Sequence, residues 1–216
     1  MIGDRLIIEK HHTDRAFELY GLLQPEVKRG FTLSIAGESG SGKSELAYEL
    51  RRILVEHGVK TSILQQDDYF VFPPKTNHEM RKKNIDQVGL YEVKLDFMDC
   101  NLRSFKRSES PLYKPLVVFE EDRIKVEEMD IDGIDILIAE GTYTSVLNFI
   151  DRRIFIDRNY QETLEARKKR ARDKFEPFIE DVLEREHRVI STHKKHADYM
   201  IPPDFSCVKD VKNAKN

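Results

Sequence analysis

The sequence predicts an α/β fold built around a parallel β-sheet. Three short apolar runs, at residues 31–36, 59–65 and 134–141, have the length and composition of strands that are buried on both faces. A glycine-rich turn separates the first run from an amphipathic segment, so a strand, a loop and a helix follow one another directly. Because 216 residues can bury the core of one domain, we expect a single domain over residues 1–216.

The first half of the chain shows these elements in order. Apolar residues at helical spacing predict a helix over residues 14–24, which Pro25 ends. After the first strand, the segment from Ser44 to Gly58 keeps its leucines on one face and finishes at a glycine suited to a helix C-terminus. The strand at 59–65 follows, so we expect two parallel strands joined by a helix.

The middle of the chain is less regular. Prolines interrupt residues 70–130, within which the pattern predicts a helix over 91–105 and an extended pair over 115–129. We interpret residues 70–130 as an insertion between the strands of the sheet.

The last third of the chain returns to regular elements. A short apolar run at 152–158 adds another strand to the predicted sheet. Residues 162–195 are densely charged and helical, with a break at Pro177 that divides them into two helices. A last strand is expected at 197–201, and we expect the tail after Pro203 to be weakly ordered.

Composition and charge exclude several classes of protein. Lys and Arg total 36 against 39 for Asp and Glu, so the net charge of −3 predicts no nucleic-acid and no membrane partner. There is no apolar span of about 20 residues. Cys100 and Cys207 lack the spacing of a disulfide framework or a zinc site, which predicts a cytoplasmic protein. The sequence is compatible with a homo-oligomer.

The glycine-rich turn carries the clearest chemical signal, because residues 37–44, GESGSGKS, match the phosphate-binding pattern GxxxxGK[ST] in full. Glycines let successive backbone N–H groups surround phosphate oxygens, Lys43 reaches the β- and γ-phosphates, and Ser44 can bind Mg²⁺. A flexible linker of the same composition would not need a strand before it and a helix after it. We expect nucleotide binding by Gly37, Glu38, Ser39, Gly40, Ser41, Gly42, Lys43 and Ser44. The predicted fold is thus that of a P-loop NTPase, with three α/β/α layers.

Other P-loop classes fit the rest of the sequence poorly. A signalling GTPase needs an NKxD segment for base recognition, and none occurs. The DxxG at 130–133 precedes a predicted strand instead of following one. Motor and helicase ATPases usually have paired acids at the end of a strand, whereas the strand at 134–141 ends in Glu140 and a glycine. Kinases of small molecules remain.

Residues 31–201 resemble the uridine kinase and phosphoribulokinase-like group of P-loop kinases, which includes bacterial-type pantothenate kinase. The resemblance depends on an ordered set of segments: GESGSGKS, LQQDDYF, PLYKP, ILIAEGTY, FIDRNYQETLEARKKRARD and HKKHADYMI. It implies an enzyme that transfers the γ-phosphate of ATP to a hydroxyl group, with Mg²⁺, and a substrate-side role for residues 70–130.

The resemblance also implies roles for two acids at strand ends. Asp67 follows the second strand and would face the acceptor hydroxyl as a general base, with Asp68 as a second candidate. Glu140 would arrange Mg²⁺ or its waters. The alternative for the aspartates is a structural role in capping a loop.

The charged helices at about 160–192 match the lid of these kinases, whose arginines close over the phosphates. The resemblance assigns catalytic roles to Arg167 and Arg170 and nucleotide binding to Arg172. Alternatively, these arginines form a solvated helix face that pairs with the downstream glutamates.

The chain departs from uridine kinases at the acceptor side. Phe70 stands where their acidic motif has a tyrosine, no histidine follows Tyr113 at the expected place, and the lid lacks an Arg-Gly-Arg turn. Several basic residues in the insertion fit an anionic or polyhydroxylated acceptor, or a solvated surface. They are Lys75, His78, Arg81, Lys82 and Lys83.

Two hypotheses of function follow. The first is an ATP-dependent small-molecule kinase similar to uridine kinase, with a sugar, a phosphosugar or pantothenate as alternative acceptors. The second is a regulatory module that binds nucleotide without turnover. Asp67, Glu140 and the arginine-rich lid favour the enzyme, because a module that only binds ATP needs no carboxylate facing an acceptor.

Overall fold

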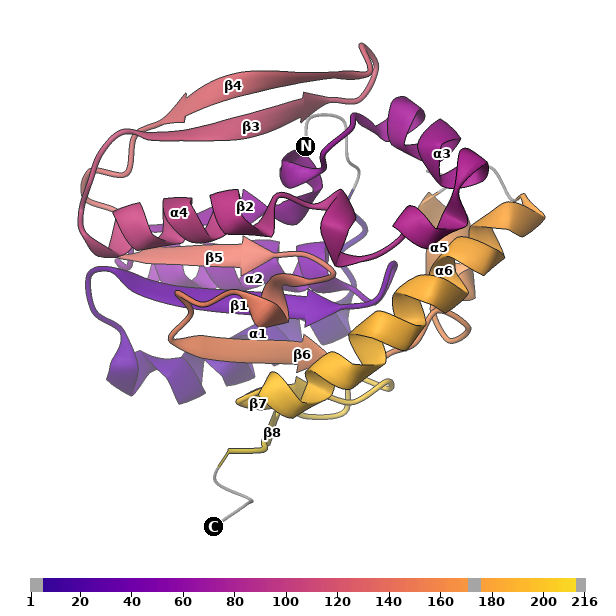
Figure 1. Cartoon of the computed structure of the whole chain (residues 1–216). Coiled ribbons are helices and arrows are strands. Elements are labelled where there is room, and N and C mark those ends of the chain that lie inside the picture. The colour runs from indigo at the N-terminus through magenta and orange to yellow at the C-terminus, as the bar shows by residue number, and fades with distance from the viewer. Residues whose placement is uncertain (1–5, 171–175, 213–216) are drawn as a thin grey trace.

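A computed structural model describes residues 6–170 and 176–212 and shows an α/β fold around a six-stranded sheet (Figure 1). The strand order is β2-β5-β1-β6-β7-β8, with parallel pairing throughout except that β8 runs antiparallel to β7. The strands of this sheet are β1 (Phe31–Gly37), β2 (Thr61–Gln65), β5 (Ile136–Glu140), β6 (Arg152–Ile156), β7 (Tyr199–Ile201) and β8 (Lys209–Asp210).

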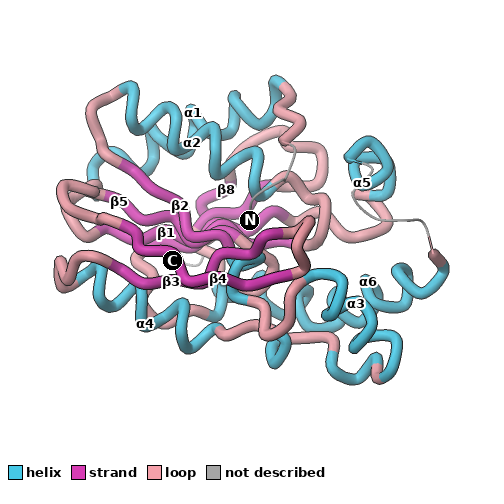
Figure 2. Tube along the Cα trace, turned by 90° about the horizontal axis from the view of Figure 1, so that it is seen from above, coloured by secondary structure: helices cyan, strands magenta, loops and turns pink. Residues whose placement is uncertain are grey.

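Helices cover both faces of the sheet, so the molecule has three layers (Figure 2). The helices α1 and α2 lie on one face, and α4 and α6 lie toward the other. The helices are α1 (Lys10–Leu23), α2 (Lys43–Glu56), α3 (Pro74–Lys83), α4 (Leu95–Lys106), α5 (Leu164–Arg170) and α6 (Pro177–Ile190). Within the described ranges no helix combines the length and the apolar character needed to cross a membrane.

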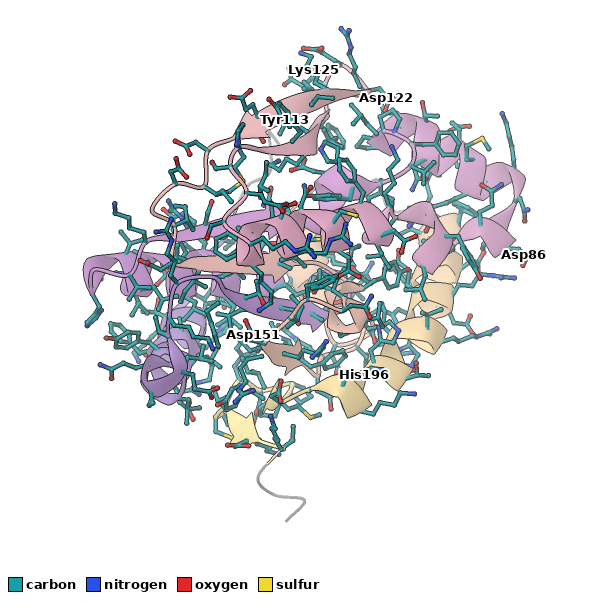
Figure 3. All side chains as sticks on the ribbon, turned by 60° about the vertical axis from the view of Figure 1, so that its left-hand side comes forward. Asp86, Tyr113, Asp122, Lys125, Asp151 and His196 are labelled. Carbon is teal, nitrogen blue, oxygen red and sulfur yellow. The ribbon has the colours of Figure 1, made fainter. Side chains whose placement is uncertain are left out.

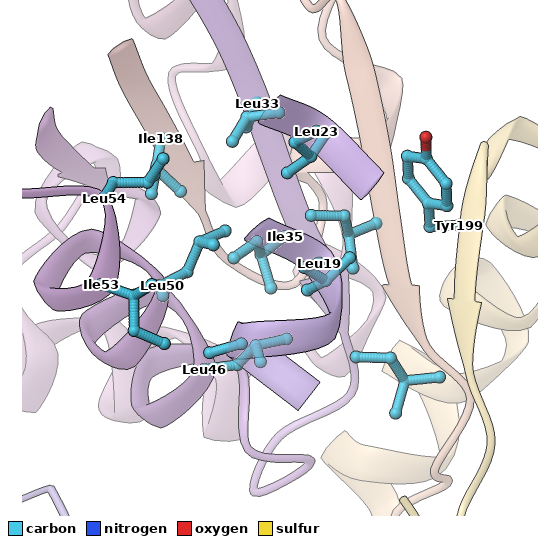
Figure 4. Packing of buried hydrophobic residues seen from close by; sticks show 14 of the residues in the cluster. Leu19, Leu23, Leu33, Ile35, Leu46, Leu50, Ile53, Leu54, Ile138 and Tyr199 are labelled. Carbon is cyan, nitrogen blue, oxygen red and sulfur yellow. The ribbon is translucent and has the colours of Figure 1, made fainter. Parts of the chain in front are cut away.

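The core divides at the sheet because side chains of a strand alternate between its faces. On β5, Ile136 and Ile138 pack with α1 and α2, whereas Leu137 and Ala139 pack with α4. Figure 4 shows the first of these clusters, in which leucines of α1 and α2 meet Ile35 of β1. Full burial of each such side chain contributes about 1.5–3 kcal/mol, which makes the central strands a rigid support for the residues at their ends.

A separate antiparallel hairpin, β3 (Leu112–Val118) and β4 (Arg123–Met129), lies outside the main sheet (Figure 1). It corresponds to the extended pair expected within 115–129. Its turn contacts α3, because Asp122 accepts hydrogen bonds from the backbone N–H of Lys75 at 2.7 Å and from the hydroxyl of Thr76 at 2.7 Å. Figure 3 shows Asp122 at this end of the hairpin. The hairpin thus caps the first turn of α3, where backbone N–H groups need acceptors.

Two boundaries differ from the sequence prediction for local reasons. The first helix begins at Lys10 because Glu9 and His12 cap it reciprocally, and the Nδ1 atom of His12 accepts the Glu9 N–H at 3.0 Å. The helix expected over 91–105 begins at Leu95, since a 3₁₀ turn at Leu90–Glu92 precedes it.

Two elements were not expected. The helix α3 has no apolar periodicity and is held by its neighbours, so the pattern could not reveal it. The prediction of a weakly ordered tail was wrong for Lys209–Asp210, which form β8 by pairing with β7.

Candidate active site

The phosphate loop joins the end of β1 to the start of α2, as expected. Gly42 has a φ of 100° directly before α2, and a Cβ there would lie 2.8 Å from the Nε2 atom of His12. Lys43 is buried, and its Nζ atom donates to the carbonyl oxygen of Glu38 at 2.9 Å. The hydroxyl of Ser41 is buried and has no hydrogen-bond partner among the described residues. A left-handed glycine and an unsatisfied buried hydroxyl fit a loop that surrounds a phosphate.

The first turn of α2 meets the end of β5. The hydroxyl of Ser44 lies 3.1 Å from the Oε1 atom of Glu140, and Glu140 is opposite Ile35 of β1 and Gln65 of β2 in the parallel register. Burial raises the pKa of Glu140 to about 7; Lys43 opposes this rise and Asp67 adds to it. A hydroxyl and a carboxylate side by side are the oxygen donors that Mg²⁺ prefers.

Asp67 and Asp68 lie in a 3₁₀ turn at Gln66–Tyr69, directly after β2, and their carboxylates have different surroundings. Asp68 is buried, and its carboxylate accepts hydrogen bonds from Lys114 at 3.1 Å and from the Val117 N–H at 3.0 Å. Asp68 therefore connects the turn to β3. Asp67 is half-buried and lines a large cavity. Of the two, only Asp67 is placed to meet a ligand there.

A glutamine that the sequence did not single out completes this end of the sheet. Gln66 is buried, and its Oε1 atom accepts the Tyr143 N–H at 2.6 Å. A Cβ on Gly141, which has a φ of 157°, would lie 2.2 Å from the Cβ of Gln66. The glycine after Glu140 is therefore required by the packing of β2 against β5.

Of the three lid arginines only Arg167 has a described side chain, and this side chain lies against the phosphate loop. The Arg167 side chain is 8% exposed, and a Cβ on Gly40 would lie 2.6 Å from its Cγ atom. Its Nη2 atom donates to the Tyr160 carbonyl at 3.0 Å, while its Nε atom is buried with no partner in the described part of the chain. The side chain of Arg170 and the whole of Arg172 lie outside the described residues.

A cavity of about 700 Å³ opens beside these residues. It extends from Ser39 and Gly40 in the phosphate loop past Asp67 to α3 and the start of α6. The described lining contains equal numbers of lysine or arginine and of aspartate or glutamate side chains. The cations are Lys75, Arg81, Lys82 and Arg167, and the anions are Asp67, Glu79, Glu176 and Glu186. Three phenylalanines give it apolar surface: Phe70, Phe72 and Phe119.

Arg81 has a role that the sequence did not reveal. Its guanidinium donates to both carboxylate oxygens of Glu92, at 2.5 and 2.8 Å, and to Glu186 at 3.0 Å. Burial raises the pKa of Glu186, and the charge of Arg81 opposes this rise. The sequence did not indicate this pairing, because Glu92 lies 11 residues away across a chain reversal and Glu186 lies 105 residues away in α6.

Of the other basic residues that the sequence singled out in the 70–130 insertion, some line the cavity and one does not. Lys75, His78 and Lys82 line the cavity with Arg81, whereas Lys83 does not. Within residues 6–170 and 176–212, no three His, Cys, Asp or Glu side chains gather into a group that could hold a metal ion. Any Mg²⁺ bound at Ser44 and Glu140 would therefore need ligands from the nucleotide or water.

The chain is similar to known kinases over most of its length. The model of the "Phosphoribulokinase / Uridine kinase family" matches residues 32–207. A bifunctional alpha-galactosidase/sucrose kinase from Mediterraneibacter gnavus is 30% identical over 188 residues, which are 81% of this chain and 20% of that protein. The chain thus spans about a fifth of the length of that relative.

A second relative and a solved structure are of comparable size to this chain. Uridine kinase from Leuconostoc citreum is 27% identical over 183 residues, covering 79% of this chain and 86% of that protein. A structure from Bacillus stearothermophilus, described as a possible uridine kinase, has a TM-score of 0.63 at 19% identity and covers 87% of this chain and 97% of its own. With the family match over residues 32–207, the chain belongs to the phosphoribulokinase / uridine kinase family of P-loop kinases.

Proposed function

We propose that this protein transfers the γ-phosphate of ATP to a hydroxyl group of a small molecule. One observation supports this proposal above all: Lys43, Ser44, Glu140 and Asp67 gather where β1, β5 and β2 end, and Asp67 lines a cavity of about 700 Å³. The carboxyl ends of parallel strands are where ligands bind in such sheets. Family membership implies the use of ATP.

The phosphate loop would bind the nucleotide through residues 37–44. Lys43 would exchange the Glu38 carbonyl for phosphate oxygens, and its charge would stabilise the transferring group. Ser44 and Glu140 would hold Mg²⁺, which when bound neutralises charge on the phosphates. A raised pKa of about 7 makes Glu140 ready to ionise as a cation approaches.

Asp67 would accept the proton of the acceptor hydroxyl or orient that hydroxyl toward the phosphate. Its neighbour Asp68 is engaged with β3, so the two carboxylates have different tasks. Arg167 would supply its unpartnered Nε donor to the transferring phosphate, since it lies against Gly40 of the loop. The lid at residues 160–192 would exclude water during transfer.

The charge of the cavity favours a neutral acceptor. The lysines and the arginine that α3 contributes to the described lining each already have a partner, so an acceptor carboxylate or phosphate would compete with these contacts. Lys82 pairs with Glu176 at 3.1 Å, Arg81 with Glu92 and Glu186, and Lys75 donates to the Glu120 carbonyl at 3.0 Å. An anionic acceptor such as a phosphosugar or pantothenate would have to break these pairs.

We therefore propose a neutral polyhydroxylated acceptor, held by residues of the 70–130 insertion. The aromatic rings of Phe70, Phe72 and Phe119 could stack on a nucleobase or on the apolar face of a sugar. A nucleoside agrees with the uridine kinase from Leuconostoc citreum. A saccharide agrees with the sucrose kinase from Mediterraneibacter gnavus, to which this chain has the higher identity.

The experiment is an ADP-release assay with ATP, Mg²⁺ and separate acceptors: uridine, cytidine, sucrose, fructose, pantothenate and glycerate. Stimulation by one of the four neutral compounds, confirmed by isolation of its phosphorylated product, supports the proposal and identifies the class. Stimulation by the two anionic compounds alone would contradict the neutral acceptor. Binding of ATP without transfer to any compound would instead favour the regulatory module.

A further inference from the structure

The phosphate loop contains a carboxylate that binding of phosphate does not explain. Glu38 is its second residue, and the side chain is 7% exposed. A buried negative charge beside a site for a polyanion is unfavourable unless other groups bind it. The contacts of Glu38 therefore indicate what this carboxylate does.

Both carboxylate oxygens of Glu38 contact the lid. Oε2 accepts the backbone N–H of Tyr160 at 2.7 Å, and Tyr160 lies four residues before the start of α5 at Leu164. Oε1 lies 2.6 Å from the Nδ1 atom of His187 in the last turn of α6. The rings of Tyr160 and His187 are themselves in contact, with centroids 5.7 Å apart. A single side chain of the phosphate loop thus holds both segments of the lid.

The backbone of Tyr160 also carries a contact to Arg167. Its N–H donates to Glu38, while its carbonyl oxygen accepts from Arg167 Nη2 at 3.0 Å and from the hydroxyl of Thr163 at 3.1 Å. The carbonyl of Glu38 in turn accepts from Lys43. Through the backbone and side chain of Glu38 and the backbone of Tyr160, these hydrogen bonds connect the lysine of the loop to the arginine of the lid.

We propose that Glu38 is a positioning residue that fixes α5 and α6 against the phosphate loop and so places Arg167 beside Gly40. The inference depends on the proposed kinase function for its effect on transfer, but the contacts themselves do not. Loss of the carboxylate leaves the backbone N–H groups of the loop in place. It releases the lid, so that water reaches the site and Arg167 is displaced.

The test compares Glu38→Ala, Glu38→Gln and His187→Gln with Glu184→Gln as a matched control. Glu184 is on α6 but pairs with Arg188 at the surface, at 2.6 Å. Hydrogen exchange of the amides in residues 160–167 and 177–190 reports the position of the lid without reference to activity. Steady-state kinetics of phosphate transfer, and the rate of ATP hydrolysis without acceptor, report how the position of the lid affects catalysis.

We expect Glu38→Ala to speed exchange in both segments and to lower kcat for transfer by about tenfold to 100-fold, the range for a misplaced catalytic group. KM for ATP should stay within about twofold, and the ratio of hydrolysis to transfer should rise about tenfold. His187→Gln should affect α6 more than residues 160–167, and Glu184→Gln should match the wild type.

Unchanged exchange in the Glu38 variants would overturn the proposal, as would a loss expressed entirely in KM for ATP. If Glu38→Ala does not fold, Glu38→Gln and His187→Gln decide the question by the same readouts. If the wild type transfers phosphate to no acceptor, the proposed function fails, whereas the exchange experiment still tests the role of Glu38.

Discussion

The hydroxyl of Ser44 lies 3.1 Å from the carboxylate of Glu140, which joins the first turn of α2 to the end of β5. This contact brings together residues 96 positions apart and places a carboxylate with a raised pKa beside the phosphate loop. It is the point at which the nucleotide, a metal ion and the sheet would meet. Predictions about this site follow from its charges.

Glu140 should make the stability of the protein depend on pH. Its pKa rises from 4.5 to about 7 on folding, so the folded state binds more protons than the unfolded state between these values. The free energy of unfolding should therefore fall as pH rises through this window. The loss is about 3 kcal/mol, since each pH unit contributes about 1.4 kcal/mol. Glu140→Gln should remove it, as urea unfolding of both proteins from pH 4 to 8 would show; parallel curves would refute the assignment.

Asp67→Asn should abolish transfer and keep ATP binding. Removal of a general base commonly lowers the rate by about 10²–10⁴-fold, and Asp67 lines the cavity from the turn after β2, outside the phosphate-binding residues 37–44. Transfer rates and ATP affinity by calorimetry would be measured side by side. The control is Asp86→Asn, the same substitution at a surface position. The Asp86 side chain is 74% exposed, and this variant should behave as the wild type. Equal activity of Asp67→Asn would exclude Asp67 as the base.

Asp68→Ala should unfold easily, although it neighbours Asp67. The change removes the acceptor of the buried Val117 N–H and one of the partners of Lys114, which keeps Glu127 at 2.7 Å. A buried donor left without its acceptor costs about 1–3 kcal/mol. Denaturant unfolding should show a lower midpoint than for Asp67→Asn. If the two variants had the same stability, the distinction between the aspartates would not hold.

Lys43→Ala should remove turnover while leaving the fold intact. The conformation of the loop depends on the positive φ angles of its glycines and not on the lysine side chain. The charge of Lys43 stabilises the transferring phosphoryl group, and its loss should lower the rate by about 10²–10³-fold or more. Circular dichroism and thermal unfolding would check the fold, and ADP release would check the rate. A variant that loses its structure would show that Lys43 also supports the loop.

Much of the sheet could be predicted because its signals are local. The runs that became β1, β2, β5 and β6 are continuous and apolar, and the phosphate-loop motif needs only its own eight residues and two neighbours. The strand β8 could not be predicted, since two polar residues pair with β7 only after the chain returns to the sheet edge. The helix α3 depends in the same way on Asp122, 46 or 47 residues away.

The site could be predicted only in part, because its remaining contacts link distant elements. The sequence pattern indicated both Asp67 and Asp68 as candidates for the general base. The 3₁₀ turn distinguishes them, because it directs Asp68 toward β3 and Asp67 toward the cavity. Arg81 belongs to a basic segment of the sequence, and its partner Glu186 is 105 positions away. Our proposal of a neutral acceptor depends on such pairs, which the sequence pattern alone could not show.

The decisive measurement is phosphate transfer from ATP to a neutral hydroxyl compound by the wild type and by Asp67→Asn. We expect the wild type to form a phosphorylated product of uridine, cytidine, sucrose or fructose, and Asp67→Asn to lose this activity while it retains its affinity for ATP. Tight ATP binding by both proteins with no product from any acceptor would contradict it and leave the regulatory module as the function.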